Sequence, residues 1–137
     1  LDRLRAIKHV DRLQGLKVLL AEDNAVNQLI VKEGLASTGV VIAVAANGKA
    51  AVDMAAQSHF DMVLMDMQMP VMGGVGAVKL IRTLPGYLDT PILAMTANAY
   101  ADDRQACLAA GMNDHIAKPI MLDRLIERMA YWAARID

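Results

Sequence analysis

Five polar side chains follow short apolar runs of this chain, each near the point where a run ends. Glu22 and Asp23 follow the first run, and Asp66 follows the third. Thr96 follows the fourth run and Lys118 the fifth. Carboxylates that crowd together resist ionisation, and a hard cation such as Mg²⁺ relieves this because it prefers oxygen ligands. With a lysine as fixed positive charge and a threonine as hydroxyl donor, this set is suited to an aspartate that accepts a phosphoryl group.

The apolar runs that precede these residues have the length of buried strands. They span residues 18–21, 40–44, 62–65, 91–95 and 115–117. None alternates with polar residues, which is typical of strands covered on both faces in a parallel sheet. Stretches of helical length separate them, at residues 27–37, 48–57, 74–83 and 101–110. A last stretch, residues 122–133, repeats apolar residues with the i, i+3, i+4, i+7 spacing of one helical face.

This alternation of strands and helices predicts an α/β fold with right-handed crossovers, an open doubly wound parallel sheet in three layers. In such a sheet, ligands bind beyond the carboxyl ends of the strands. The five polar side chains should therefore meet at one edge. Residues 1–15 stand apart, because their apolar residues recur every third position and build no firm helical stripe. We predict a linker or a helical extension there, and one domain over residues 16–137.

The composition excludes several classes of protein. The chain has 137 residues, of which 55% are hydrophobic, and this fraction excludes a disordered chain. Its lone Cys107 excludes a disulfide scaffold, and the net charge of −1 gives no case for binding nucleic acid. The longest uncharged apolar run, residues 40–46, is far shorter than the ~20 residues of a membrane span. We expect a cytoplasmic setting and, because the chain begins with Leu1, a fragment of a longer protein.

Four motifs carry the polar residues in order along the chain. They are Ala21-Glu22-Asp23-Asn24, Leu64-Met65-Asp66-Met67-Gln68-Met69-Pro70, Met95-Thr96-Ala97 and Lys118-Pro119. Together they resemble the signatures of response-regulator receiver domains, over about residues 16 to 135. The pair Asn27-Gln28 and the stretch Gly111-Met112-Asn113-Asp114-His115 are most similar to receivers attached to hybrid sensor histidine kinases.

The resemblance implies a flavodoxin-like sheet with strand order 2-1-3-4-5 and a role for each motif residue. Asp66 is expected to be the phosphoacceptor, with Lys118 on the phosphoryl oxygens and Thr96 as the switch residue. Mg²⁺ is the expected cofactor. Its site is expected to comprise Glu22, Asp23, Asp66 and the backbone carbonyl of Gln68. The Lys118-Pro119 bond is expected to be cis.

The resemblance also implies partners and a switch surface. The partners are a histidine kinase domain or a histidine phosphotransfer domain, with no direct contact to nucleic acid or membrane. The switch surface is formed by the fourth helix, fifth strand and fifth helix, through which two copies could pair. His115 stands where the family often has a switch aromatic, so this chain departs from the family's pattern at the position of the rotating ring. Gln68 and Asn98 occupy positions that influence phosphoryl loss in the family.

Two other functions stay open from the residues alone. An aspartate-nucleophile phosphatase usually carries a second Asp two residues after the nucleophile, and here that position is Gln68. A phosphorylation-independent interaction module would leave the acidic pocket unused, which intact Asp66, Thr96 and Lys118 argue against. Tyr131 and Trp132 either pack against the fold or form a partner surface, and the sequence does not choose between these roles.

Overall fold

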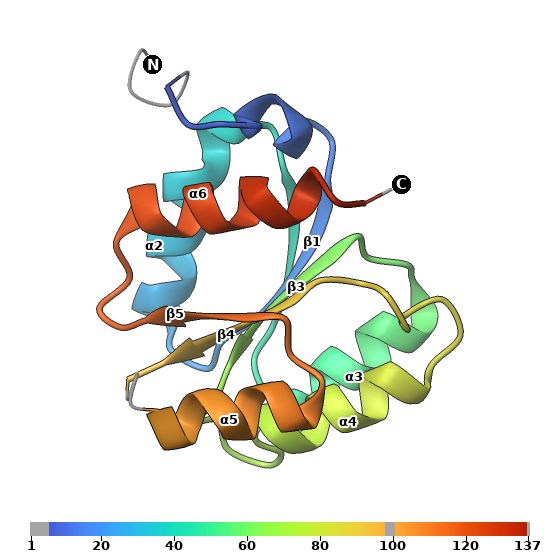
Figure 1. The fold of residues 1–137 in the computed structure, drawn as a ribbon. Coiled ribbons are helices and arrows are strands. Elements are labelled where there is room, and N and C mark those ends of the chain that lie inside the picture. The colour runs from blue at the N-terminus through green and yellow to red at the C-terminus, as the bar shows by residue number, and fades with distance from the viewer. Residues whose placement is uncertain (1–5, 98–100, 137) are drawn as a thin grey trace.

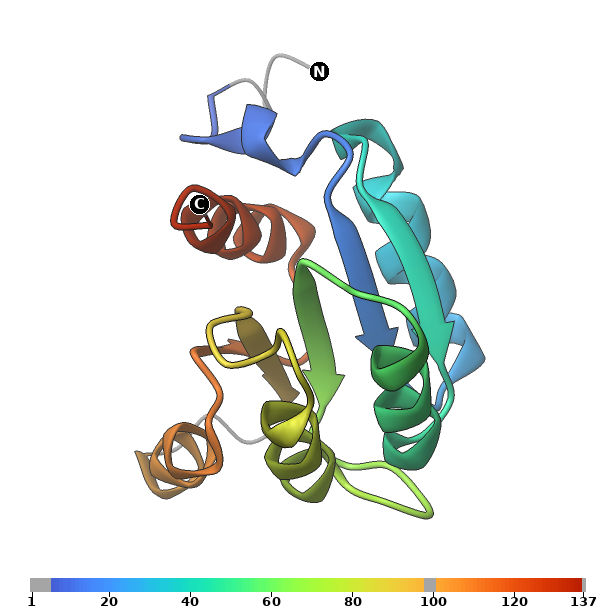
Figure 2. The same ribbon diagram turned by 90° about the vertical axis from the view of Figure 1, so that its right-hand side faces the viewer.

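The computed structural model describes residues 6–97 and 101–136 and contains a five-stranded parallel sheet (Figure 1). The strands are β1 (Lys17–Ala21), β2 (Val41–Ala45), β3 (Met62–Asp66), β4 (Ile92–Thr96) and β5 (Asp114–Ala117). Their order across the sheet is β2-β1-β3-β4-β5, and every neighbouring pair is parallel. The arrowheads of β1, β2 and β3 accordingly point the same way in Figure 2. The predicted doubly wound α/β fold and its strand order are confirmed.

Helices alternate with the strands along the chain. They are α2 (Ala25–Leu35), α3 (Gly48–Gln57), α4 (Gly74–Thr83), α5 (Ala101–Ala110) and α6 (Leu122–Ala133). Helix α2 begins two residues earlier than predicted, because the side chain of Asn24 caps it by accepting from the N–H of Asn27 at 3.0 Å. It also ends earlier, because a 3₁₀ turn, η2 (Ala36–Thr38), closes the segment before Gly39 at a φ of 83°. Within the described ranges, no helix combines the length and apolarity needed to cross a membrane.

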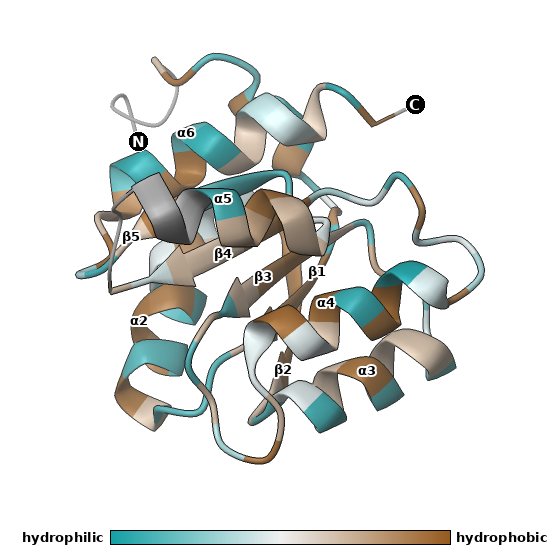
Figure 3. Ribbon diagram, turned by 60° about the horizontal axis from the view of Figure 1, so that its bottom comes forward, coloured by the Kyte–Doolittle hydropathy of each residue, from teal (hydrophilic) through white to brown (hydrophobic). Residues whose placement is uncertain are grey.

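The helices cover both faces of the sheet and bury it in a middle layer. On one face α3, α4 and α5 pack over strand residues such as Leu19 and Val63, and on the other α2 and α6 pack over Leu20 and Leu64. Successive strand residues point to opposite faces, so neighbours in one strand enter different clusters. This explains why the apolar runs do not alternate with polar residues. Figure 3 shows largely hydrophobic strands beside helices that also carry hydrophilic stretches.

The described part of the N-terminal segment packs against the layer that holds α6. A short 3₁₀ helix, η1 (Val10–Leu13), precedes β1 and places Leu13 at 0% exposure among the residues that α2 and α6 bury. Gly15 then donates its N–H to the carbonyl of Gly39 at 2.8 Å, which joins the segment to the turn before β2. The segment thus contributes to the core next to α6. Residues 1–5 lie outside the described residues, and the domain boundary at residue 16 stays a prediction.

Candidate functional site

The carboxyl ends of β1 and β3 bring three acidic side chains together. Glu22 directly follows β1, and Asp66 is the last residue of β3, the strand beside it. One carboxylate oxygen from each of Glu22, Asp23 and Asp66 lies within 4.8 Å of the others. The side chain of Lys118, just beyond β5, reaches back across β4 to this cluster. Its Nζ lies 3.0 Å from Oδ1 of Asp66 and 3.5 Å from Oε2 of Glu22.

Burial and charge set the electrostatics of this cluster. Glu22 is 1% exposed and Asp66 is 2% exposed, whereas Asp23 faces solvent. Burial raises the pKa of Glu22, and the nearby charge of Asp66 adds to this, although hydrogen bonds to Glu22 and the charge of Lys118 oppose it. Burial alone would lower the pKa of Lys118, but its contacts with Asp66 and Glu22 outweigh burial and raise that pKa. The lysine is therefore held in its charged form among the carboxylates.

The first turn of α2 holds Glu22 in place. Oε1 of Glu22 accepts hydrogen bonds from the main-chain N–H of Asn24 at 3.1 Å and from Nδ2 of Asn27 at 3.3 Å. Nε2 of Gln28 donates to the main-chain carbonyl of Glu22 at 2.6 Å. Asn27 and Gln28 entered the sequence analysis only as part of a motif. The signal for a contact was their position in a helical first turn that directly follows an acidic strand end.

The loop after β3 and the start of α4 position Asp66 from the other side. The main-chain N–H of Gln68 donates to Oδ1 of Asp66 at 3.2 Å, and the Gln68 side chain is exposed. Gly74, the first residue of α4, lies so close that a Cβ there would sit 2.7 Å from the carbonyl oxygen of Asp66. A side chain at position 74 would therefore push this loop away. Asn98 lies outside the described residues.

The other two predicted residues lie on the β4 and β5 side of the cluster. Thr96, the last residue of β4, is 6% exposed, and its carbonyl accepts from the N–H of Lys118 at 2.8 Å. The Lys118-Pro119 bond is cis, as predicted.

A cavity of about 420 Å³ opens beside Lys118 and is lined mainly by apolar side chains. Its lining residues are Glu22, Asn27, Ile30, Val31, Met95, Lys118, Pro119 and Ile120.

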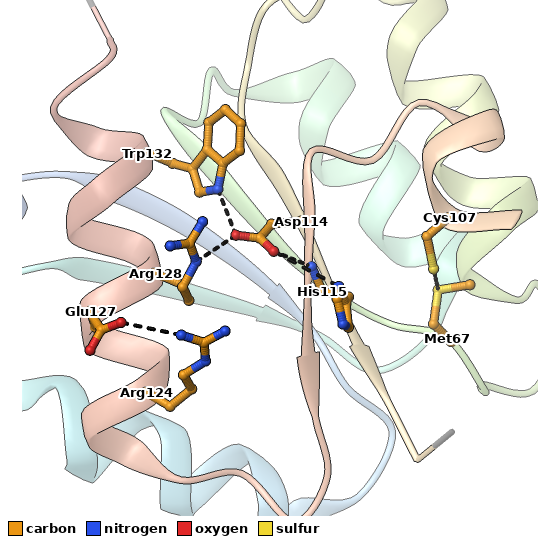
Figure 4. A network of polar contacts seen from close by, with 8 residues as sticks. All are labelled: Met67, Cys107, Asp114, His115, Arg124, Glu127, Arg128 and Trp132. Atoms are coloured by element: carbon orange, nitrogen blue, oxygen red, sulfur yellow. Dashed lines mark hydrogen bonds and ion pairs between the residues drawn. The ribbon is translucent and has the colours of Figure 1, made fainter. Parts of the chain in front are cut away.

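His115 lies away from the acidic cluster, in a second polar network that joins β5 to α6 (Figure 4). Its neighbour Asp114 accepts at Oδ2 from Nε of Arg128 at 2.7 Å and from Nε1 of Trp132 at 2.8 Å. Oδ1 of Asp114 accepts from the N–H of His115 at 2.8 Å. Burial alone would raise the pKa of Asp114, but these hydrogen bonds and the charge of Arg128 lower it overall.

This network was not predicted from the sequence, which left the role of Trp132 open. The structure answers that question, because the indole N–H of Trp132 is bonded within the fold. Tyr131 has a different role: it is 36% exposed, and the guanidinium carbons of Arg128 and Arg135 lie 4.4 Å and 3.4 Å from its ring centre. A usable signal existed, since Arg128 and Trp132 are four residues apart and must share one face of a helix.

The donor chemistry of the acidic cluster fits a hard divalent cation. Its three side chains offer carboxylate oxygens from Glu22, Asp23 and Asp66. Mg²⁺ prefers oxygen ligands, keeps several waters and needs only one or two carboxylates from a protein. The exposed position of Asp23 leaves one side of the cluster open to solvent, where such waters and a phosphoryl group would enter.

Comparison with known proteins identifies the family. The model of the response regulator receiver domain matches residues 18–130, so the chain belongs to that family. Among curated proteins, the signal transduction histidine-protein kinase BarA of Escherichia coli is 39% identical over 111 residues, which cover 81% of this chain but 12% of BarA. The sensor histidine kinase RcsC of Salmonella typhi is 33% identical over 129 residues, 94% of this chain and 13% of RcsC.

Solved structures agree with this assignment. The receiver domain of the sensor histidine kinase PA1611 from Pseudomonas aeruginosa superposes with a TM-score of 0.82 at 40% identity, covering 88% of this chain and 98% of that one. That crystal structure holds a magnesium ion coordinated in its active-site cleft. The receiver domain of Ssk1 from Saccharomyces cerevisiae, solved in complex with the phosphotransfer protein Ypd1, gives 0.81 at 29% identity and covers 89% of this chain and 91% of that one.

The chain is therefore a phosphoacceptor receiver domain of two-component signalling, related to the receivers of hybrid sensor histidine kinases. It spans about an eighth of the length of the curated kinases BarA and RcsC, which it matches only in this part.

Proposed function

We propose that Asp66 takes a phosphoryl group from a phosphohistidine of a partner protein. The observation that carries this proposal is the ammonium group of Lys118, 3.0 Å from Asp66, inside a cluster that holds three carboxylates. In the transfer, an oxygen of Asp66 forms the new bond to phosphorus while the bond from phosphorus to the histidine nitrogen breaks. The electron pair of that bond returns to the imidazole. Lys118 then balances part of the charge on the phosphoryl oxygens.

Mg²⁺ is the cofactor that we propose for this step. Asp23 and Asp66 would hold it directly with the carbonyl of Gln68, and Glu22 would complete the acidic site. When bound, the ion supplies positive charge that offsets the charge of the carboxylates and the phosphoryl group. The chain's own groups fix the geometry: Asp66 is held by the N–H of Gln68 and by Lys118, and Gly74 lets α4 begin directly against it.

We also propose that Thr96 reports the phosphorylated state to the surface formed by α5, β5 and α6. Thr96 ends β4, and its carbonyl is bonded to the N–H of Lys118 just past β5, so a shift at one strand end reaches the other. His115 lies in β5 and is the residue through which this surface would respond. Two copies of the chain would pair through the same surface in the active state.

The phosphoryl donor or acceptor that we propose is a histidine kinase domain or a histidine phosphotransfer domain. The Ssk1 receiver, solved with Ypd1, shows that a related receiver binds a protein of the second kind. In this chain, three apolar side chains of α2 are exposed near the acidic cluster: Val26 at 65%, Leu29 at 55% and Ile30 at 43%. Ile30 also lines the cavity beside Lys118. An apolar surface beside a phosphoacceptor suits a docked helical partner.

One experiment tests phosphoryl transfer directly. The chain is incubated with Mg²⁺ and a small acyl phosphate, and intact mass is measured. We expect one added phosphoryl group in the wild type and none in Asp66→Asn. Asp53→Asn is the matched control, because Asp53 is an exposed aspartate on α3 that pairs with Lys49. This variant should gain one phosphoryl group, as the wild type does. A wild type without an adduct, or an undiminished adduct in Asp66→Asn, would contradict the proposal. Turnover of a phosphomonoester would favour a phosphatase instead.

A further inference from the structure

The amide side chain of Asn27 is turned toward the acidic cluster from the first turn of α2. Its Nδ2 donates to Oε1 of Glu22 at 3.3 Å, and its side chain lines the cavity that also reaches Lys118. We propose that Asn27 is a positioning residue of the metal site, acting through Glu22. The inference rests on the magnesium site of the proposed function and adds to it a residue outside the ligand set.

The local geometry explains how a helix start can orient a carboxylate. At many helix starts the side chain three residues after the cap bonds back to the main-chain N–H of the capping residue. Here the capping residue is Asn24, and Glu22 takes its N–H instead. Asn27, at the third helical position, donates to the same oxygen, Oε1 of Glu22. Two donors from one turn thus hold one oxygen of this carboxylate against α2.

The second oxygen of Glu22 is thereby directed at the cluster. Oε2 lies 3.5 Å from Nζ of Lys118, and the same Nζ also contacts Asp66. The main chain at Glu22 is fixed independently, because Gln28 donates to its carbonyl and its own N–H donates to the carbonyl of Ala45 at 3.0 Å. With the backbone fixed, rotation of the Glu22 side chain is the remaining freedom, and Asn27 restricts it.

An amide suits this position for a reason of charge. The cluster already holds three carboxylates against one lysine. An aspartate at position 27 would bring another negative charge toward it, and an alanine would not reach Glu22. Asn27 donates a hydrogen bond and adds no charge. Residues that orient a metal ligand in this way typically contribute about 10–100-fold to metal affinity, and a 3.3 Å hydrogen bond belongs at the lower end of this range.

The test is a double-mutant cycle on Mg²⁺ affinity, measured by titration calorimetry with the 137-residue chain. The four proteins are the wild type, Asn27→Ala, Glu22→Ala and the double variant. We expect Asn27→Ala to raise the Kd for Mg²⁺ about tenfold. In the Glu22→Ala background the same change should raise the Kd less than about twofold, because its acceptor is gone. Asn27→Ala should keep the melting temperature, since the cap uses the main-chain N–H of residue 27.

The matched control is Asn47→Ala. Asn47 caps α3, accepting from the N–H of Ala50 at 2.8 Å, and lies outside the acidic cluster. Its loss should lower the melting temperature and leave the Kd for Mg²⁺ unchanged, the opposite pattern to Asn27→Ala. The inference is overturned alone if the wild type binds Mg²⁺ and Asn27→Ala stays within twofold of it, or if the effect of Asn27→Ala persists undiminished without Glu22. A wild type that binds no Mg²⁺ overturns both the metal site and the inference.

Discussion

Asp66 and Asp114 each lie beside a basic side chain, yet their surroundings have opposite character. Asp66 bonds to Lys118 at 3.0 Å but shares its cluster with two other carboxylates. Asp114 bonds to Arg128 at 2.7 Å and accepts further hydrogen bonds from Trp132 and from the main chain of His115. The first cluster has more negative than positive charge, whereas the second pairs one carboxylate with one cation.

This difference separates a binding site from a structural contact. We call the second site, Asp114 with Arg128 and Trp132, the Asp114 clamp. A partly buried ion pair is stable when its charges balance and its hydrogen bonds are satisfied, which describes Asp114 and Arg128. A cluster with surplus negative charge is stabilised when a cation joins it or a carboxylate takes a proton. The pKa directions agree with this reasoning. Burial together with Asp66 raises the pKa of Glu22, whereas hydrogen bonds and Arg128 outweigh burial and lower the pKa of Asp114.

The largest effect on stability should come from removing the carboxylate of Asp114, which holds the charge-balanced network between β5 and α6 together. Asp114→Ala leaves Arg128 and the indole N–H of Trp132 without their acceptor. We expect the free energy of unfolding to fall by about 3 kcal/mol, because two partly buried donors lose their acceptor at a cost of roughly 1–3 kcal/mol each. Chemical denaturation with and without Mg²⁺ measures it, and the loss should be equal in both conditions.

Asp53→Ala is the control for this loss. Asp53 forms an exposed pair with Lys49 at 2.9 Å, with side-chain exposures of 54% and 64%. Such surface pairs contribute about 0–1 kcal/mol, so the change should be close to zero. An Asp114→Ala variant as stable as Asp53→Ala would show that the network on α6 is not a clamp.

Added Mg²⁺ should have the next largest effect, and only through the acidic cluster. A ligand that binds only the folded state at 100 times its Kd stabilises that state by about 2.7 kcal/mol. We expect this gain in the wild type and in Asp114→Ala, and its loss in Asp66→Asn. Thermal melts over a Mg²⁺ series, with the same series in Na⁺ at matched ionic strength, measure it. Equal stabilisation of Asp66→Asn would remove Asp66 from the metal site.

The fold and the acidic cluster could be predicted from the sequence because each rests on local patterns. Strands buried on both faces must be apolar at every position, so their runs were visible one by one. A residue that ends a parallel strand lies at a known edge of the sheet, so Glu22, Asp66, Thr96 and Lys118 could be placed together without knowing side-chain positions. Their spacing also carried the family resemblance.

The network around Asp114 could not be predicted in the same way. It depends on how α6 is rotated against β5, which is set by packing of Leu125, Ile126 and Met129 into the core and not by a strand end. The contact of Asn27 with Glu22 was missed for a related reason. It requires α2 to begin at Ala25, two residues before the start that we predicted, because Asn24 caps the helix.

Removing the charge of Asp66 should stabilise the chain when Mg²⁺ is absent. In Asp66→Asn the repulsion from Glu22 and Asp23, within 4.8 Å, is lost together with the attraction to Lys118 at 3.0 Å. With an effective dielectric constant near 20, two repulsions at such distances slightly exceed the one attraction, so we expect a gain of about 1 kcal/mol. Urea denaturation in EDTA measures it. A loss of stability would mean that Lys118 alone balances the cluster.

The smallest effect should be the dependence of the Asp114 clamp on pH. In the folded chain the pKa of Asp114 lies below its ordinary value of 3.8. The stability that the ionised Asp114 contributes is therefore fully present above pH 3.8, and it is lost as the pH falls through the lower pKa of the folded state. The loss is partial, because a protonated carboxyl group still accepts from Trp132. The stability difference between wild type and Asp114→Asn, measured in EDTA, should be constant from neutral pH down to about 5 and narrow only in stronger acid.

Glu22 should show the opposite sign in the same experiment. Its pKa lies above the ordinary value of 4.5, so the folded state takes up a proton more readily than the unfolded chain. As the pH falls toward that value, the wild type should therefore gain stability relative to Glu22→Gln, while its advantage over Asp114→Asn is still unchanged. The stability of the wild type relative to Glu22→Gln and its stability relative to Asp114→Asn could instead change in the same direction as the pH falls. The acidic cluster would then be charge-balanced like the network on α6, and the contrast between the two carboxylate sites would fail.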